Sequence, residues 1–265
     1  PRIFVESLQA GQLHSDLSGD ILHYVLNVMR LKNGNRVRVF NEIIGEWLAE
    51  IRTTGSRGKN ASLLLDEQLR EVQSDRKGLL PCSLLVAPIK KARFKLLIEK
   101  ATELGVAHII PIITQNTQHA VDSDSIEQFR NAAIQSAEQC ERLTVPCIHD
   151  PITLQHLLDL SSGNPSADSA HNRLSTAQPL LTAVQHILRH PPAHQAATSS
   201  TQEPYFNLLT GPEGGFTELE LQKLSALPAA SLVSLGPTIL RAETAAVFAL
   251  STVSAAVCAK NYEGK

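Results

Sequence analysis

Two glycine-containing segments near the carboxyl end of the chain have the composition of ligand-binding turns. The first is GPEGGF at residues 211–216, directly after an apolar run at 205–210 that predicts a strand. Thr217 and Glu220 have the spacing of a capping box, which predicts that a helix begins there. Because Gly214 and Gly215 lack a Cβ and tolerate positive φ, a ligand can approach the main chain closely and bind its N–H and C=O groups.

The second segment is GPTILRAET at residues 236–244, between a predicted strand at 231–235 and a long helix of small residues. Ligands of α/β proteins commonly bind beyond the carboxyl ends of strands, so the two turns are expected to form the walls of one pocket. Neither turn has the glycine spacing of a dinucleotide or P-loop site. The pattern favours a small ligand held by backbone and apolar contacts, and two ordinary strand-to-helix connections are the alternative.

The elements that must position these turns alternate along the chain from about residue 78. Strands are predicted at 79–89 and 107–113, and helices at 94–104 and 125–142, which indicates a parallel sheet covered by helices. Residues 161–203 are rich in Ser, Ala, Pro, Gln and His. We interpret them as a variable excursion with a helix near 180–190 and room for one poorly marked strand.

Residues 1–72 have the pattern of a small β-rich module with one helix. Ser18 can cap the helix, and strands are predicted at 36–40, 47–51 and 61–65. Between Arg30 and Lys59 there are seven basic and three acidic residues. This excess could follow a phosphate backbone, and a solvated strand face is the alternative.

Composition and charge narrow the function classes. The 265 residues suffice for one large domain or two small ones, and 43% hydrophobic residues can fill a core. A formal net charge of −2 gives no whole-molecule basic field, so nucleic acid would have to bind a local patch. The long uncharged stretch at 244–259 contains Ser and Thr and is shorter than the roughly 20 apolar residues of a membrane span. No membrane association is expected.

The amino terminus has no apolar run of the length of a signal peptide. We therefore expect a cytoplasmic protein, or one of an organelle matrix if a leader was trimmed. Four cysteines (Cys82, Cys140, Cys147 and Cys258) form no CxxC pair and have no histidine at zinc-ligand spacing, which predicts ordinary buried thiols and no metal. The histidines at 186, 190 and 194 are spaced like ligands, but two prolines at 191–192 would break the helix that aligned them.

Five segments, taken in order, resemble the RsmE-type ribosomal RNA methyltransferases of the SPOUT superfamily. They are HYVLNVMRL, KKARFKLLIEKATELGVAHIIPI, EQCERLTVP, GPEGGF with a following Glu, and LGPTILRAETA. The resemblance spans nearly the whole chain apart from 161–203, and the two glycine motifs are its most specific part. It implies a PUA-like β-barrel RNA-binding domain at 1–72 and a trefoil-knotted α/β SPOUT methyltransferase domain at 73–265.

The resemblance also implies S-adenosylmethionine as cofactor, lying against the two turns and the end of the preceding strand. In this chain those positions are Leu209, Thr210, Gly211, Glu213, Gly214, Gly215, Leu235, Gly236, Ile239, Leu240 and Arg241. The implied reaction is methylation of N3 of a uridine in small-subunit ribosomal RNA, free or in the assembled subunit.

The acceptor N3–H must lose its proton during transfer, and a nearby cation would stabilise the developing anion. Arg142 and Arg241 are the candidate cations, and Glu138 and Glu243 are candidate acid or base groups. Each carboxylate has a plain alternative, since Glu138 could sit on its helix surface and Glu243 could favour the positive end of the last helix. The candidate RNA contacts are Arg30, Arg36, Arg38, Lys90, Lys91, Arg93 and Arg142, for which a solvated face is the alternative.

A homodimer is expected because small side chains on the last helix would let a partner approach closely; they are Ala245, Ala246, Ala249, Ala255 and Ala256. The chain departs from the family pattern at Glu141, where a small residue is expected, and at residues 41–43, where Asn-Glu-Ile replaces an Asp-Gly turn. Other hypotheses are a SPOUT enzyme acting on transfer RNA or a ribose 2′-hydroxyl, and a non-catalytic RNA-binding or ribosome-assembly factor. A generic dinucleotide enzyme lacks its phosphate fingerprint.

Overall fold

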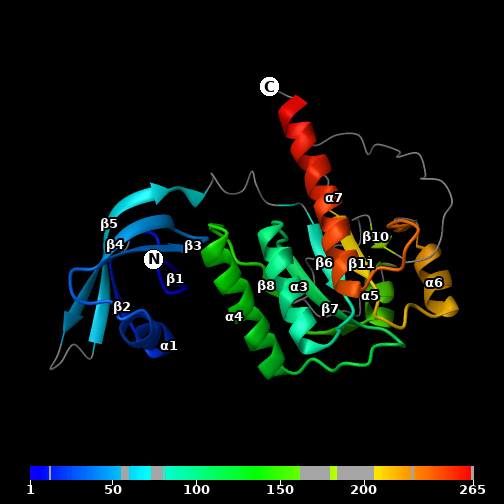
Figure 1. The fold of residues 1–265 in the computed structure, drawn as a ribbon, viewed down its shortest axis with the longest axis horizontal. Coiled ribbons are helices and arrows are strands. Elements are labelled where there is room, and N and C mark those ends of the chain that lie inside the picture. Colours follow the sequence, from blue (N-terminus) through cyan, green and yellow to red (C-terminus); the bar gives the residue numbers. More distant parts are fainter. Residues whose placement is uncertain are drawn as a thin grey trace. The chain divides into compact units, whose positions relative to one another are not determined.

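The computed structural model describes residues 1–11, 13–54, 60–72, 80, 82–161, 180–183, 206–227 and 230–263 (Figure 1). The chain divides into two compact units. The first, here the N-terminal unit, comprises residues 1–79 and 134–145, and the second, the C-terminal unit, comprises residues 80–133 and 146–265. No helix among these described residues is long and apolar enough to cross a bilayer.

The N-terminal unit contains a five-stranded sheet in the order β1-β3-β4-β5-β2. Its strands are β1 (Arg2–Phe4), β2 (His14–Leu17), β3 (Arg36–Asn41), β4 (Gly45–Thr54) and β5 (Asn60–Arg70). Only the β1–β3 pairing is parallel. The three predicted strands are confirmed as parts of β3, β4 and β5. In β3, Val37 and Val39 are buried while Arg36 and Arg38 are more exposed, as the alternation of a half-buried strand requires.

The predicted helix of this unit begins with α1 (Gly19–His23) and continues as one π-helical turn, η1 (Tyr24–Val28). Its apolar residues pack on a core that includes Val37, Val39 and Ile51. Ser18 is at the N-cap position, as predicted, but its side chain makes no capping hydrogen bond. The prediction of a Ser18 side-chain cap is therefore wrong, and packing of the apolar face holds the helix.

The turn that replaces the expected Asp-Gly pair is shaped by the side chain of Asn41. Its Nδ2 donates to the carbonyl oxygens of Val5 and Leu8 at 3.0 and 2.8 Å, and its Oδ1 accepts from the amide of Ile44 at 2.9 Å. Gly45 ends the turn with φ of +77°, and a Cβ there would overlap the carbonyl oxygen of Arg70. The conformational role of the missing glycine is thus taken by position 45.

The C-terminal unit contains a parallel sheet in the order β12-β10-β11-β6-β7-β8, with β9 paired to β7. The strands are β6 (Cys82–Val86), β7 (His108–Ile113), β8 (Cys147–Ile148), β9 (Ile152–Thr153), β10 (Leu180–Ala183), β11 (Phe206–Thr210) and β12 (Ala230–Val233). The helices are α3 (Lys91–Glu103), α4 (Ser123–Gln139), α5 (Leu154–Ser161), α6 (Glu218–Ser225) and α7 (Ala242–Glu263). Residues 134–139 of α4 belong to the N-terminal unit.

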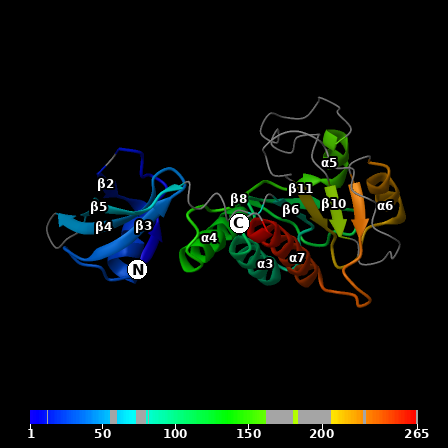
Figure 2. The ribbon, with the colours of Figure 1, turned by 90° about the horizontal axis from the view of Figure 1, so that it is seen from above.

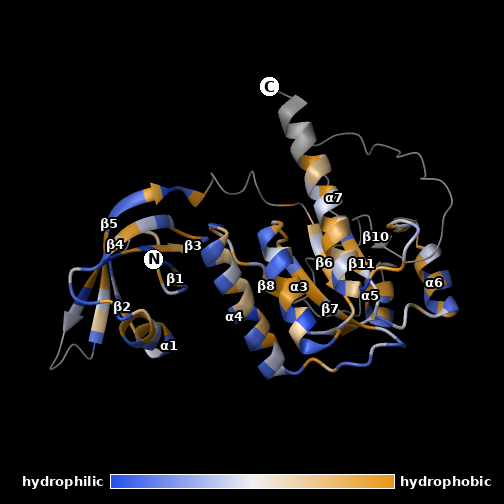
Figure 3. Ribbon diagram, viewed as in Figure 1, coloured by the Kyte–Doolittle hydropathy of each residue, from blue (hydrophilic) through white to orange (hydrophobic). Residues whose placement is uncertain are grey.

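Helices cover both faces of this sheet: α3 and α7 lie on one face and α5 on the other (Figure 2). Leu85 and Leu209 form a core cluster with Leu157 of α5. Their neighbours Leu84 and Leu208 are also fully buried, and alternation directs them to the opposite face. Figure 3 shows the resulting concentration of apolar residues in the central strands. The predicted α/β architecture is confirmed.

Two element predictions are wrong in detail. Leu180–Ala183 is the strand β10 and not the start of a helix predicted at 180–190; residues 184–190 lie outside the described residues. The backbone pairs with β11 and β12 on its two sides, which overrides the local helical pattern. The helix predicted to reach residue 142 ends at Gln139, because Glu141 adopts a φ of +61° that no helix continues.

Candidate active site

The two glycine turns follow parallel strands that end on the same side of the sheet, at the carboxyl ends of the strands. Thr210 at the end of β11 pairs in register with Ala183 of β10, and Ala183 pairs with Val233 at the end of β12. Neighbouring strands lie about 4.8 Å apart, so the two turns start roughly 10 Å from each other. A single small organic molecule can span that distance.

The first turn is tight and braced by its own aromatic ring. The Gly215 amide donates to the carbonyl oxygen of Pro212 at 2.9 Å. A Cβ on Gly211 would lie 2.8 Å from the ring of Phe216, so any larger residue would force this ring to move. Gly215 has φ of +71° and open space where a Cβ would point, whereas Glu213 and Gly214 are exposed. The backbone of the turn is therefore accessible to a ligand.

The loop after β7 supports this turn through two residues that sequence reasoning missed. Nδ2 of Asn116 donates to the carbonyl oxygens of Gly214 and Gly215 at 3.2 and 3.0 Å. The amide of Gln115 donates to Oε1 of Glu220 at 2.8 Å. No local pattern marks Asn116, because its partners are about a hundred residues away along the chain.

The capping box predicted after the first turn is confirmed. Oγ1 of Thr217 accepts from the Glu220 amide at 3.2 Å, and Oε2 of Glu220 accepts from the Thr217 amide at 2.8 Å. Glu220 thus closes the start of α6 with one oxygen and holds the loop at Gln115 with the other. The turn is fixed between two braced elements.

A buried hydroxyl lies at the point where β11 enters the first turn. Thr210 is 1% exposed, and its Oγ1 has no hydrogen-bond partner within the part of the chain that the structure describes. Leaving such a group unsatisfied costs about 1–3 kcal/mol. A polar ligand atom at this strand end would satisfy it, so the residues present fit an organic cofactor that carries hydrogen-bonding groups.

The second turn presents apolar side chains to solvent. Gly236 has φ of +120° with nothing near its missing Cβ. Ile239 is 69% exposed, Leu235 and Leu240 are half-buried, and Arg241 is exposed. Exposed apolar residues beside an open glycine suit a surface that a ligand or a partner covers.

Glu243 lies in the first turn of α7, which supports its interpretation as a favourable charge at a helix N-terminus. Its Oε1 lies 3.7 Å from Nε of Arg93, while Oε2 is buried without a hydrogen-bond partner among the described residues. Arg93, a candidate RNA contact, is therefore partly engaged within the protein. Lys90 and Lys91 at the start of α3 are exposed.

The other two candidate catalytic residues belong to the N-terminal unit, because residues 134–145 pack there. Oε1 of Glu138 accepts from the amide of Phe4 at 3.0 Å. Burial raises the pKa of Glu138, opposed by the Phe4 amide and by Arg2. Arg142 is 8% exposed, and its guanidinium lies 3.0 Å from Oγ1 of Thr144. The glycine turns belong to the C-terminal unit, whereas Glu138 and Arg142 belong to the N-terminal unit.

Basic residues of the N-terminal unit differ in whether they form ion pairs with acidic residues of the same unit. Arg38 contacts Glu46 at 3.3 Å and Glu141 at 2.8 Å, and the hydrogen bond to Glu141 raises the pKa of Arg38. Arg36 pairs with Asp66 at 3.0 Å on the surface. Arg30 is exposed and has φ of +55°. Arg38 thus has a structural role, and Arg30 presents its charge to solvent.

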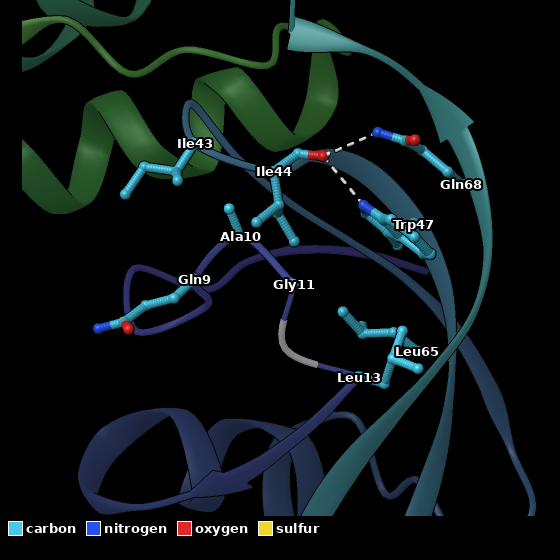
Figure 4. A pocket seen from close by; sticks show the side chains of 9 residues that line it. All are labelled: Gln9, Ala10, Gly11, Leu13, Ile43, Ile44, Trp47, Leu65 and Gln68. Atoms are coloured by element: carbon cyan, nitrogen blue, oxygen red, sulfur yellow. Dashed lines mark hydrogen bonds between the residues drawn. The ribbon is translucent and has the colours of Figure 1, made fainter.

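The N-terminal unit has a pocket of about 210 Å³ that matches no predicted site (Figure 4). Two hydrogen bonds join residues that line it: the carbonyl oxygen of Ile44 accepts from Nε1 of Trp47 at 2.9 Å and from Nε2 of Gln68 at 3.1 Å. The lining residues are Gln9, Ala10, Gly11, Leu13, Ile43, Ile44, Trp47, Leu65 and Gln68. None carries a charge, so this pocket does not suit a phosphate.

A second, open groove of about 410 Å³ lies between α3 and α7. Leu96 and Phe248 beside it are 47% and 49% exposed. It is lined by Leu96, Leu97, Lys100, Glu243, Thr244, Val247, Phe248 and Ser251. By contrast, three alanines expected at a dimer surface (Ala245, Ala246 and Ala249) are at most 4% exposed within the protomer. That part of the expectation is wrong, because these small residues let α7 pack closely on its own unit.

Comparison with known families agrees with this fold. Residues 76–254 match the RNA methyltransferase domain, and residues 17–61 match the RNA methyltransferase PUA domain. The molecule is thus an RNA methyltransferase with a PUA domain.

The particular family follows from its relatives. The chain is 36% identical over 253 residues to ribosomal RNA small subunit methyltransferase E of Rickettsia conorii, an alignment that covers 95% of this chain and 94% of the relative. The enzyme of the same name from Synechocystis is 30% identical over 88% of this chain and 70% of the relative. The chain belongs to the ribosomal RNA small subunit methyltransferase E family.

Solved structures give the same fold. A protein of Legionella pneumophila, described as a methyltransferase and solved with the bound cofactor SAM, has a TM-score of 0.72 at 29% identity over 96% of this chain and 97% of the other. Ribosomal RNA small subunit methyltransferase E of Neisseria gonorrhoeae, solved with S-adenosyl methionine, has a TM-score of 0.73 at 24% identity over 97% of each chain. The second likeness concerns the fold alone.

Proposed function

We propose that this protein transfers the methyl group of S-adenosylmethionine to N3 of a uridine in small-subunit ribosomal RNA. The observation that carries the proposal is the pair of glycine turns at one sheet edge, beside the buried Thr210 hydroxyl without a partner among the described residues. The names of the curated relatives and the cofactor of the Legionella protein support it. The substrate is the RNA itself or the assembled small subunit.

The cofactor supplies an electrophilic methyl group on a sulfonium, so the protein chiefly has to position the acceptor and manage one proton. The residues proposed to hold it are Leu209, Thr210, Gly211, Glu213, Gly214 and Gly215 of the first turn, and Leu235, Gly236, Ile239, Leu240 and Arg241 of the second. Thr210 would donate or accept one hydrogen bond to the cofactor, and Gly214 and Gly215 would offer it main-chain hydrogen-bonding groups. Ile239 would cover an apolar part of the cofactor.

Proton removal from N3 is assisted by positive charge. Arg241 is exposed in the second turn, so it is the cation proposed to stabilise the developing uracil anion. Arg142, predicted for the same role, is buried in the N-terminal unit, and its role stays a prediction. Glu243 has one buried carboxylate oxygen with no hydrogen-bond partner among the described residues, and it stays a candidate acid or base group. Glu138 already accepts the Phe4 amide, which favours a positioning role.

The proposal is tested by mass spectrometry of ribosomal RNA nucleosides. Small subunits from a strain that lacks the gene should contain no 3-methyluridine at the target, and the purified protein with S-adenosylmethionine should restore it. Appearance of the methyl group on transfer RNA or on a ribose oxygen would contradict the substrate assignment. Absence of cofactor binding in calorimetry would instead support a non-catalytic RNA-binding factor.

The cofactor site is tested by Thr210→Val, which keeps the shape of the side chain and removes the buried hydroxyl. We expect a folded protein whose Kd for S-adenosylmethionine rises about tenfold, the value of one lost hydrogen bond. Thr102→Val is the matched control, because Oγ1 of Thr102 donates to the Ile98 carbonyl oxygen at 2.8 Å inside α3. An equal effect of both variants would contradict the assignment.

The family fold implies a homodimer, and we propose that a second copy of this chain covers the groove between α3 and α7. An isologous interface requires a patch that complements itself, and this groove combines apolar side chains with Lys100 and Glu243 of opposite charge. Phe248→Glu should convert a dimer to a monomer in analytical ultracentrifugation. Leu219→Glu, at a 61% exposed position on α6, should leave the mass unchanged.

Residues 1–72 are proposed as a PUA-like β-barrel domain that binds RNA, and residues 73–265 as a cytoplasmic SPOUT domain with a trefoil knot. α7 contacts both β10 and β11, and the trefoil knot is proposed from the family resemblance alone. Arg30, Lys90 and Lys91 are the proposed phosphate contacts. Replacing each with Ala should weaken RNA binding and reduce its salt dependence by about one charge.

A further inference from the structure

Three potential metal ligands converge at one end of the sheet in the C-terminal unit. They are His108 on β7, Cys147 on β8 and His149 directly after β8. Their ligand atoms all lie within 4.8 Å of one another. Nδ1 of His108 is 3.1 Å from Nε2 of His149, and the two ring centroids are 5.2 Å apart.

Backbone pairing brings these side chains together. His108 is the register partner of Cys147 in the parallel β7–β8 pair. Cys147 and His149 are two residues apart, so their side chains leave the strand on the same face. The amide of Cys147 donates to the carbonyl oxygen of Ala107 at 2.9 Å, and the amide of His149 donates to that of Ile109 at 3.0 Å. The three ligands are therefore held by ordered main chain.

The donor set and its spacing select the type of ion. Two imidazole nitrogens and one thiolate suit a borderline-soft ion such as Zn²⁺ and not Mg²⁺ or Ca²⁺, which prefer oxygen. Bond lengths of about 2.1 Å to nitrogen and 2.3 Å to sulfur place the ligand atoms of a tetrahedral Zn²⁺ roughly 3.3–3.6 Å apart. The 3.1 Å between the two nitrogens and the 4.8 Å limit for the set bracket this range.

We propose that His108, Cys147 and His149 form a zinc site with solvent as the fourth ligand. Cys147 is exposed, so the prediction of a buried thiol is wrong at this position, and the proposed site departs from the expectation of no metal. The two histidines are half-buried, so water can reach the ion. The site would clamp β8, a strand of only two residues at the sheet edge, to β7. The chain returns to the C-terminal unit at residue 146, one residue before Cys147, so the clamp would hold the start of this second segment. This role is structural and separate from methyl transfer.

The test uses the tag-free full chain, stripped with a chelator and then titrated with ZnCl₂ in a calorimeter. One Zn²⁺ per chain is expected, with a thermal shift of about 5–10 °C when free Zn²⁺ is a hundred times its Kd. Co²⁺ in place of Zn²⁺ should give the absorption of a tetrahedral ion with a thiolate ligand. Cys147→Ser and His149→Gln should each weaken Zn²⁺ binding by about 100-fold or more.

Cys140→Ser and His23→Gln are the matched controls, because both residues belong to the N-terminal unit. They should leave the Kd for Zn²⁺ unchanged. The proposal is overturned if the stripped protein binds no Zn²⁺, or if Cys147→Ser and His149→Gln, folded by circular dichroism, bind it as tightly as the unmodified chain. S-adenosylmethionine binding is measured on the same samples, so failure of the zinc site and failure of the proposed methyltransferase remain distinguishable.

Discussion

Glu141 shows how a single residue can end a helix against its own preference. It adopts φ of +61°, a region that costs a non-glycine residue about 1–2 kcal/mol, and the family resemblance implies a small residue there. Its carboxylate contacts Arg38 at 2.8 Å, and its carbonyl oxygen accepts from Nη2 of Arg70 at 2.6 Å. These contacts hold the strained conformation in place.

Glu141→Gly and Glu141→Ala both remove the carboxylate, but only Ala keeps the Cβ that is strained at positive φ. We expect the Tm of the Gly variant to exceed that of the Ala variant by roughly 2–4 °C. Differential scanning calorimetry measures this difference. Equal Tm values would mean that the main chain at position 141 rearranges.

Glu138 should make stability depend on pH. Burial raises the pKa of Glu138 above its unfolded value of about 4.3. The folded state then binds the proton more tightly, so stability falls as pH rises from the unfolded pKa through the folded one and is constant above it. Glu138→Gln retains an oxygen that can accept from the Phe4 amide and cannot titrate.

We therefore expect the Tm of the unmodified chain to fall relative to that of Glu138→Gln between pH 4 and the folded pKa. Thermal denaturation from pH 4 to pH 8 measures this. Glu127→Gln, at an exposed position of the same helix, is the control and should show no such trend. The predicted direction would be wrong if the Tm of the unmodified chain fell further below that of Glu138→Gln at low pH than at high pH.

Among the elements, the start of α6 has the clearest link between local pattern and site geometry. Glu220 completes the capping box with Thr217 and also accepts the amide of Gln115 from the loop after β7. That loop carries Asn116, which holds the first glycine turn. One carboxylate thus holds both the start of α6 and the loop that braces the first glycine turn.

Glu220→Ala should lower stability by about 1–2 kcal/mol through the lost cap and should also weaken S-adenosylmethionine binding. Urea denaturation and calorimetric titration measure the two effects. Glu218→Ala is the control, because Glu218 is exposed in the first turn of the same helix. A loss of stability with unchanged cofactor affinity would mean that Glu220 stabilises α6 but does not contribute to the cofactor site.

For the molecule as a whole, the discontinuous N-terminal unit depends on one buried carboxylate. Glu46 is 1% exposed and contacts Arg2 and Arg38 at 3.3 Å and Nε of Arg70 at 2.7 Å. Arg2 also donates to the carbonyl oxygens of Ala137 and Arg142 at 2.8 and 2.6 Å. The network therefore joins β1, β3, β4 and β5 to Ala137 and Arg142, which lie 135 and 140 positions after Arg2.

Glu46→Ala leaves the guanidinium of Arg2 buried without its carboxylate and should cost about 3–5 kcal/mol. Trp47, the single tryptophan, follows Glu46 in β4, so its fluorescence reports unfolding of this unit. Glu50→Ala removes a surface partner of Arg52 and should cost at most about 1 kcal/mol. Similar losses in the two variants would contradict a dominant role for burial.

Local patterns in the sequence determined the strands, the paired glycine turns and the capping box, because backbone dihedrals, alternation and capping act over a few residues. Only the tertiary structure decided β10, whose local pattern resembles a helix and whose partners lie in β11 and β12. It also decided that Asn116 reaches Gly214 and Gly215, and that His108 meets Cys147 and His149. Such contacts depend on strand order and register, which are set by the free energy of the whole packed unit and not by neighbours in the chain.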